Sequence, residues 1–143
     1  MLLTQNIADY ILRLSEPDFG DNITNLKLQK LLYYSQGFHL AMYGTVLFEE
    51  PIKAWEHGPV VESIYHQFKK HGANAIDIPE VIDLKMFTKA QKDLLNEVYE
   101  VYGQFSAWKL RNMTHEELPW KSTPLSEVID TSLMKSFFKT LLK

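Results

Sequence analysis

The stretch NLKLQKLLYYSQGFHLAMYG, residues 25–44, constrains the fold more strongly than any other part of this chain. One set of its side chains recurs at helical spacing: Leu28, Leu31, Leu32, Ser35, Phe38 and Met42. A second apolar stripe, about 140° around the same helix, consists of Leu26, Tyr33 and Leu40. Thr24 is expected to cap the start of this helix and Gly44 to end it. Because a helix that is apolar on two sides is usually covered from both, the sequence predicts a central helix.

Five other segments carry helical periodicity or helix-start signals: residues 4–16, 59–71, 89–102, 107–118 and 131–142. Thr4 is the expected N-cap of the first segment, and Thr88 with Gln91 is expected to form a capping box for the segment that begins at residue 89. Before the third helix, TVLFEEPIKAWEHG shows partial alternation, which is typical of short strands, and we expect a hairpin with its turn near residues 49–51. The predicted fold is mainly α (α+β). About six helices lie around a central hydrophobic helix, a small β-hairpin precedes the third helix, and residues 1–143 form one domain.

Composition narrows the possible functions. The chain has no cysteine, which excludes disulfides, thiolate metal sites and cysteine nucleophiles and suits a reducing cytoplasm. A formal charge of -3 and only two arginines, Arg13 and Arg111, argue against nucleic-acid binding. No signal-peptide pattern is present, and no apolar run approaches the roughly 20 residues of a membrane-spanning helix. We therefore expect a cytoplasmic protein with no membrane segment.

Motifs for catalysis, metals and cofactors are missing from the sequence. His66 and His71 are five residues apart, so on a helix they point in different directions. No G-x-S-x-G motif and no phosphate-binding glycine loop occurs. The adjacent acidic pairs at 49–50 and 116–117 diverge from each other, and we interpret them as solvated surface. The sequence thus predicts no catalytic residue, no metal ion and no cofactor, and a protein that is not an enzyme.

Two lysines in the central helix form a candidate anion-binding pair. Lys27 and Lys30 are about 60° apart around the helix, on the side that also carries Tyr34. Two ammonium groups beside an aromatic ring could hold a carboxylate or a phosphate. The alternative is that the lysine stems cover apolar surface while the charged ends stay in water.

The stretch KAWEHGPVVESIY places five distinctive residues in a row. We expect Trp55 to fill core, Gly58 to allow a sharp reversal, and Pro59 to be the first residue of the third helix, where its missing N–H costs nothing. Glu56 and His57 remain, and they either brace this joint or face a partner. An alternative function is a small hydrolase or ligand-binding enzyme with a pocket built on His57 and Glu56.

Two segments of the chain resemble the signatures of the Panacea domain family, the SocA-like, phage-associated group of small proteins. The first is ITNLKLQKLLYYSQGFHLAMYGTVLFEEPIKAWEHGPVVESIYHQFKKHG, residues 23–72, and the second is LRNMTHEELPW, residues 110–120. The second carries a T-H-x-x-x-P-W pattern. The signature positions in this chain are Trp55, Gly58, Pro59, Tyr65, His115, Pro119 and Trp120.

The resemblance implies an antitoxin of a toxin–antitoxin pair, whose partner is a toxin protein that it neutralises by direct binding. One branch of the family instead acts as an adaptor that delivers its toxin to a protease. The resemblance supplies no catalytic residues. We place the predicted partner-binding surface at Lys27, Lys30, Tyr34, Glu56 and His57.

Overall fold

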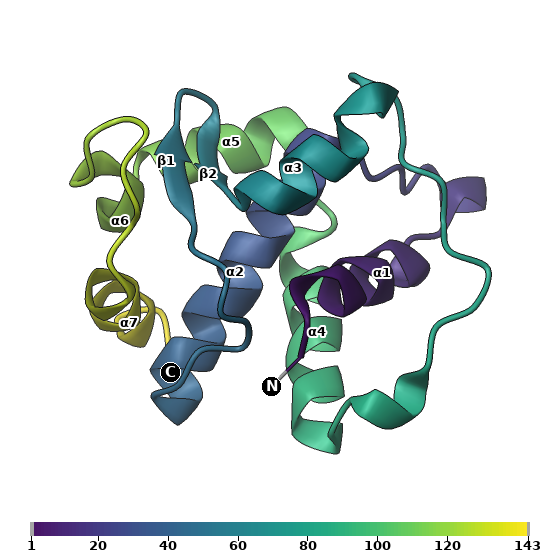
Figure 1. Cartoon of the computed structure of the whole chain (residues 1–143), viewed down its shortest axis with the longest axis horizontal. Helices are drawn as coiled ribbons and strands as arrows, with labels where there is room; N and C mark the ends of the chain where they lie inside the picture. Colours follow the sequence, from purple (N-terminus) through teal and green to yellow (C-terminus); the bar gives the residue numbers. More distant parts are fainter. Residues whose placement is uncertain (1, 143) are drawn as a thin grey trace.

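A computed structural model describes residues 2–142, so Met1 and Lys143, the two ends of the predicted domain, lie outside the described residues. The described chain is mainly α-helical with one small hairpin, which confirms the predicted fold class (Figure 1). Its elements are α1 (Thr4–Leu14), η1 (Pro17–Phe19), α2 (Asn25–Tyr43), β1 (Lys53–Trp55), β2 (Gly58–Val60), α3 (Glu62–Phe68), η2 (Lys69–His71), η3 (Leu84–Met86), α4 (Lys89–Tyr102), α5 (Ala107–His115), α6 (Leu118–Lys121) and α7 (Thr131–Lys139).

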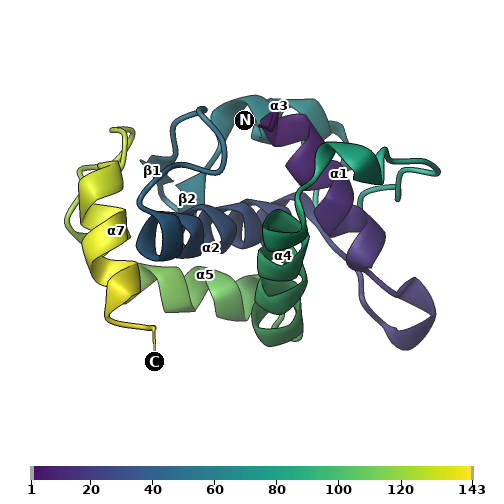
Figure 2. The same ribbon diagram turned by 90° about the horizontal axis from the view of Figure 1, so that it is seen from below.

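Helix α2 lies at the centre of the fold. It packs against α1, α3, α4, α5, α7 and β2. Figure 2 shows it between the hairpin on one side and α5 on the other, with α7 and α4 flanking its two ends. Both predicted stripes supply fully or nearly fully buried side chains, namely Leu28, Leu31, Leu32, Tyr33 and Leu40. A helix covered on two sides is therefore confirmed, although Met42 near its end is 47% exposed.

The helix ends follow local side-chain chemistry. The Thr24 hydroxyl accepts a hydrogen bond from the Lys27 amide, and Gly44 ends α2 with φ 75°. Thr88 and Gln91 form the predicted capping box. The prediction for Thr4 was wrong, because the helix already includes Thr4 and Leu3 occupies the N-cap without a side-chain bond.

The hairpin differs from the prediction in its turn. Glu56 and His57 form the turn, and Gly58 and Pro59 belong to β2 rather than to the start of a helix. Gly58 adopts φ 110°, a conformation that a residue with a side chain rarely adopts. Pro59 pairs with Ala54, and in a two-residue hairpin this second pair does not exchange hydrogen bonds. The missing N–H of proline therefore costs the strand nothing.

The segment after α5 also departs from the prediction. Helix α5, expected to reach residue 118, ends at His115, and the short helix α6 follows at residues 118–121 where PWKSTP, residues 119–124, was expected to break the chain. Pro119 lies in the first turn of α6, where proline is tolerated. The chain then runs along the free edge of β1. The Ala54 amide donates to the Glu127 carbonyl at 3.0 Å and the Ile129 amide to the Ile52 carbonyl at 2.8 Å. Helix α7 ends at Lys139, three residues earlier than expected.

Two buried glutamines of α2 fix the chain that follows it. The Gln36 side chain donates to the Phe48 carbonyl at 2.8 Å and accepts from the Leu47 amide at 2.7 Å. The Gln29 carbonyl oxygen accepts from the Val61 amide at 2.8 Å. Buried backbone groups without hydrogen-bond partners are costly, so the side-chain amides of Gln36 and Gln29 hold the loop before β1 and the start of α3 against α2.

Among the described residues, no helix is both long enough and apolar enough to cross a membrane.

Candidate partner-binding site

The two signature segments, residues 23–72 and 110–120, meet at one corner of the molecule. The indole N–H of Trp120 donates to the Trp55 carbonyl at 2.8 Å. The His115 ring stacks on the Trp120 ring, with centroids 4.0 Å apart, and Pro119 is buried beside them. The second signature segment is thus joined to the hairpin by the hydrogen bond between Trp120 and Trp55.

Trp55 lies at the edge of this corner and not in the core. Its side chain is only half-buried, which corrects the prediction that it fills core. The ring packs edge-on against Tyr65, with centroids 4.9 Å apart. Side chains alternate between the two faces of a strand. Ala54 therefore points to the buried face of β1, and the Trp55 ring points to the open face.

The lysines of the candidate pair are both buried, and each bonds to a different carbonyl. Lys27 is 6% exposed and its ammonium donates to the Gly103 carbonyl at 2.6 Å. Lys30 is 2% exposed and its ammonium donates to the Pro59 carbonyl at 3.1 Å. Burial, together with the nearby Arg111, lowers the pKa of Lys30 to about 7. Neither charged end stays in water, and the two lysines serve different parts of the fold.

Tyr34 is fully buried and belongs to a polar network that the sequence analysis missed. The hydroxyls of Tyr33 and Tyr34 each donate to one oxygen of the Glu117 carboxylate, at 2.9 Å. Burial raises the pKa of Glu117 to about 7, although the two tyrosine bonds oppose that shift. The interpretation of Glu117 as solvated surface was wrong. Two neighbouring tyrosines in a central helix need buried acceptors, and that was the available signal.

A groove of about 780 Å³ opens beside the hairpin, and we call it the hairpin groove. Its lining includes Lys30, Trp55, Glu56, His57, Trp108 and Leu125. Trp108 is 56% exposed and Leu125 is 58% exposed. The structure therefore brings three of the predicted partner-binding residues, Lys30, Glu56 and His57, to one groove. It places Lys27 and Tyr34 elsewhere in the interior.

Arg111 contacts two residues that line the hairpin groove, His57 and Trp108. Its Nε donates to Nδ1 of His57 at 3.2 Å, and its guanidinium lies over the Trp108 ring, 4.4 Å from the centroid. A His57 ring that accepts at Nδ1 is neutral and carries its hydrogen on Nε2. His57 therefore has a cation as its neighbour rather than a carboxylate.

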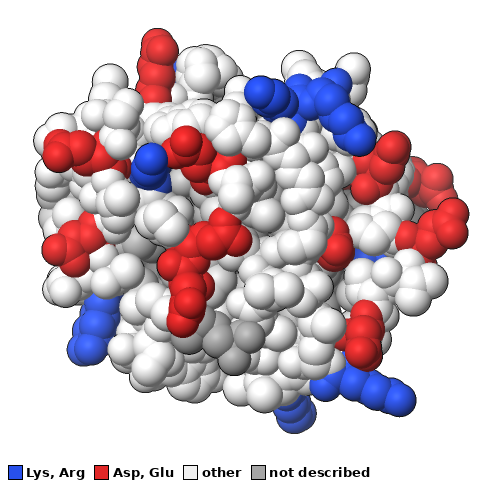
Figure 3. Space-filling view, in the orientation of Figure 1, with Lys and Arg blue, Asp and Glu red and all other residues white. Residues whose placement is uncertain are grey.

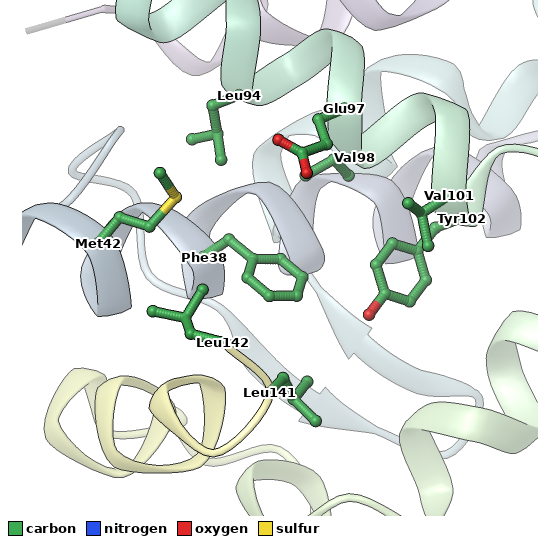
Figure 4. Close-up of a pocket in the computed structure, with 9 residues that line it drawn as sticks. All are labelled: Phe38, Met42, Leu94, Glu97, Val98, Val101, Tyr102, Leu141 and Leu142. Atoms are coloured by element: carbon green, nitrogen blue, oxygen red, sulfur yellow. The ribbon is translucent and has the colours of Figure 1, made fainter.

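A second hollow, of about 510 Å³, lies between α2, α4 and the chain after α7 (Figure 4). Its lining is mostly apolar and includes Phe38, Met42, Val98 and Leu142, with Glu97 as the charged residue. Of the predicted partner-binding residues, none lines it.

Charged side chains of both signs are mixed on the face that Figure 3 shows, with one basic cluster over the end of α3. Because the signs are mixed, recognition by this face would depend on local charged groups rather than on a broad electrostatic field of one sign.

Within residues 2–142, no three side chains of His, Asp or Glu are placed to hold a metal ion.

The fold and the corner define a mainly α-helical protein in which two distant sequence signatures build a single surface. The family model described as "Antitoxin SocA-like, Panacea domain" matches residues 28–121, and the chain belongs to this family. Antitoxin SocA of Caulobacter vibrioides (strain NA1000 / CB15N) is 30% identical over 109 residues, which cover 68% of this chain. The matched region spans 58% of the length of that antitoxin. No solved structure matches the chain.

Proposed function

We propose that this chain is an antitoxin that neutralises a partner toxin by binding it directly, with the hairpin groove as the contact surface. Family membership supports the antitoxin role. The observation that carries the proposed surface is the exposed Trp108 ring at the groove, with the half-buried Arg111 stacked on it, because tryptophan and arginine are enriched among the residues that dominate the energetics of protein interfaces.

The groove offers what a binding surface needs. Arg111 holds the Trp108 ring in place by stacking, so little side-chain entropy is lost when a partner covers it. Trp55 and Leu125 also line the groove and add apolar area. The α2 helix and the second signature support this surface from below, so the groove is present before the partner arrives.

A non-enzymatic role in the cytoplasm is part of this proposal. A general base works best beside a carboxylate that orients it, whereas the neighbour of His57 is the guanidinium of Arg111. The hydrolase built on His57 and Glu56 therefore gains no support from this geometry. Delivery of the bound toxin to a protease would require a second partner in addition to the direct contact.

The test is co-expression with the product of the gene adjacent to its own, the candidate toxin. We expect the wild-type protein to restore growth of cells that express the toxin. The Trp108→Ala variant should bind the toxin about 30-fold or more weakly, as expected for an interface hot spot. Phe19→Ala is the matched control, because Phe19 is an aromatic residue that is 82% exposed in η1, away from the groove. Equal rescue by the two variants would place the contact elsewhere, and no rescue by soluble wild-type chain would reject the antitoxin role for this pair.

A further inference from the structure

We propose that the floor of the hairpin groove is a carboxylate-binding site, formed by Lys30, Arg111 and His57, that receives an acidic side chain of the partner toxin. This inference deepens the proposed function and rests on it. It assigns a chemical preference to the surface.

Lys30 provides a buried amine with unused donors, and because burial lowers its pKa to about 7 it is protonated in roughly half of the molecules at neutral pH. Its ammonium carries three N–H groups and makes one hydrogen bond, to the Pro59 carbonyl. Gly58 covers it closely, since a Cβ at position 58 would come within 2.7 Å of Cε and 3.3 Å of Nζ of Lys30. A buried ammonium normally has an anionic partner, because desolvation of an unpaired charge is costly.

No carboxylate of the described residues supplies that partner. The ion pairs within residues 2–142 are Lys53–Glu62, His66–Glu62 and Lys89–Asp93, and none includes Lys30 or Arg111. Arg111 bonds only to His57 and to the amide oxygen of its neighbour Asn112. Lys30 lines the groove and Arg111 contacts its lining residues His57 and Trp108, yet neither cation forms an ion pair within residues 2–142, although Glu56 also lines the groove.

Positive groups near the groove also repel one another. Burial is the main cause of the lowered pKa values of Lys30 and His115. Arg111 adds to both shifts, and Lys30 and His57 add smaller contributions to that of His115. Nε2 of His115 is buried and has no hydrogen-bond partner. An anion in the groove would relieve this repulsion, with Arg111 and the Nε2–H of His57 as donors at the rim, and it would favour the protonated form of Lys30 beneath.

The surroundings favour a carboxylate over a phosphate. Glu56 also lines the groove, and its charge would oppose a dianion more strongly than a single carboxylate. The walls are formed by Trp55, Trp108 and Leu125, which suit the apolar neighbours of an acidic residue in a polypeptide. The guanidinium of Arg111 matches the planar geometry of a carboxylate.

The site is tested on the full chain without the toxin. We would titrate the protein with three compounds at equal ionic strength: N-acetyl-glutamate, its neutral analogue N-acetyl-glutamine, and inorganic phosphate. NMR would follow the chemical shifts of the Gly58 amide and the Trp108 indole N–H. The expected result is saturable shifts with the glutamate compound, weaker shifts with phosphate and none with the amide. Equal shifts with the amide, or stronger binding of phosphate, would overturn the proposal.

Substitutions separate the site from its structural support. Lys30→Met replaces the buried ammonium with an apolar chain of similar length, so we expect an unchanged or higher unfolding midpoint and loss of the glutamate-induced shifts. Lys85→Met, at an exposed lysine of η3, should leave the shifts intact. If Lys30→Met fails to fold, Arg111→Gln carries the test with the same expectation. Persistent shifts in the folded variant would contradict the assignment.

A second experiment measures the affinity of the protein for the toxin. Lys30→Met should lower the affinity for the toxin at least about tenfold, because a partner carboxylate would lose its buried counter-charge. Failure of wild-type chain to bind the toxin would reject the proposed function. Tight binding by Lys30→Met would reject only the carboxylate site, so the two failures are distinguishable.

Discussion

Replacing Phe138 with alanine is expected to lower the free energy of unfolding by about 3–5 kcal/mol, the largest loss we predict for a single side chain. Phe138 is fully buried on α7, and its ring lies 4.9 Å from Phe38, 5.3 Å from Tyr33 and 5.9 Å from Tyr34, measured between centroids. It therefore attaches the last helix to α2. Denaturant unfolding measures the loss, and Phe137→Ala is the control.

The control is on the same helix and removes the same atoms. Phe137 is only half-buried, so its truncation should cost clearly less than that of Phe138. Equal losses for the two variants would show that α7 is not attached to α2 through Phe138.

Gly37 of α2 faces the Phe138 ring, so a substitution at position 37 tests the same packing contact. Gly37 lies in the middle of α2, where alanine would ordinarily favour the helix by about 1 kcal/mol. A Cβ there would overlap the Phe138 ring, so Gly37→Ala should destabilise the protein instead. In a double-mutant cycle, Phe138→Leu should recover part of that loss. Simple additivity of the two changes would contradict this contact.

The second large effect is a pH dependence that Glu117 introduces. Its pKa is raised from 4.5 to about 7 in the folded protein, so folding favours the protonated carboxyl. The resulting stability is fully present below pH 4.5 and is lost as the pH rises through about 7. The difference corresponds to about 3 kcal/mol, at roughly 1.4 kcal/mol for each pKa unit.

Glu117→Gln tests this expectation, because the amide stays neutral and keeps an oxygen that can accept from a tyrosine. Unfolding free energies of both proteins are compared from pH 4 to pH 8. The wild-type protein should lose stability relative to the variant across that range. Parallel pH curves would mean that burial does not raise the pKa of Glu117 in the folded protein.

Local patterns predicted the helices well, for physical reasons. The two apolar stripes of α2 reflect burial on two sides, and the caps at Thr24 and Thr88 are bonds between residues three apart. Each of these signals is contained in one short segment of the chain. The class of fold followed from them directly.

The hairpin and the groove depended on contacts that no short segment contains. Pro59 has a conformation that suits a strand edge as well as a helix start, and its pairing with Ala54 of β1 places it in a strand. Lys30 is buried because Pro59 and Gly58 cover it from another part of the chain. The partners of Glu117 are in α2, more than eighty residues away. Sequence spacing could identify these residues as notable but could not bring them together.

The most direct test of the central claim is the activity of purified toxin, the product of the adjacent gene, with and without purified chain and with no protease present. Direct neutralisation predicts that toxin activity falls as chain is added and reaches its minimum near an equimolar ratio, with Trp108→Ala shifting the curve to higher concentrations. Full toxin activity at a large excess of folded chain, lost only when a protease is supplied, would contradict the account.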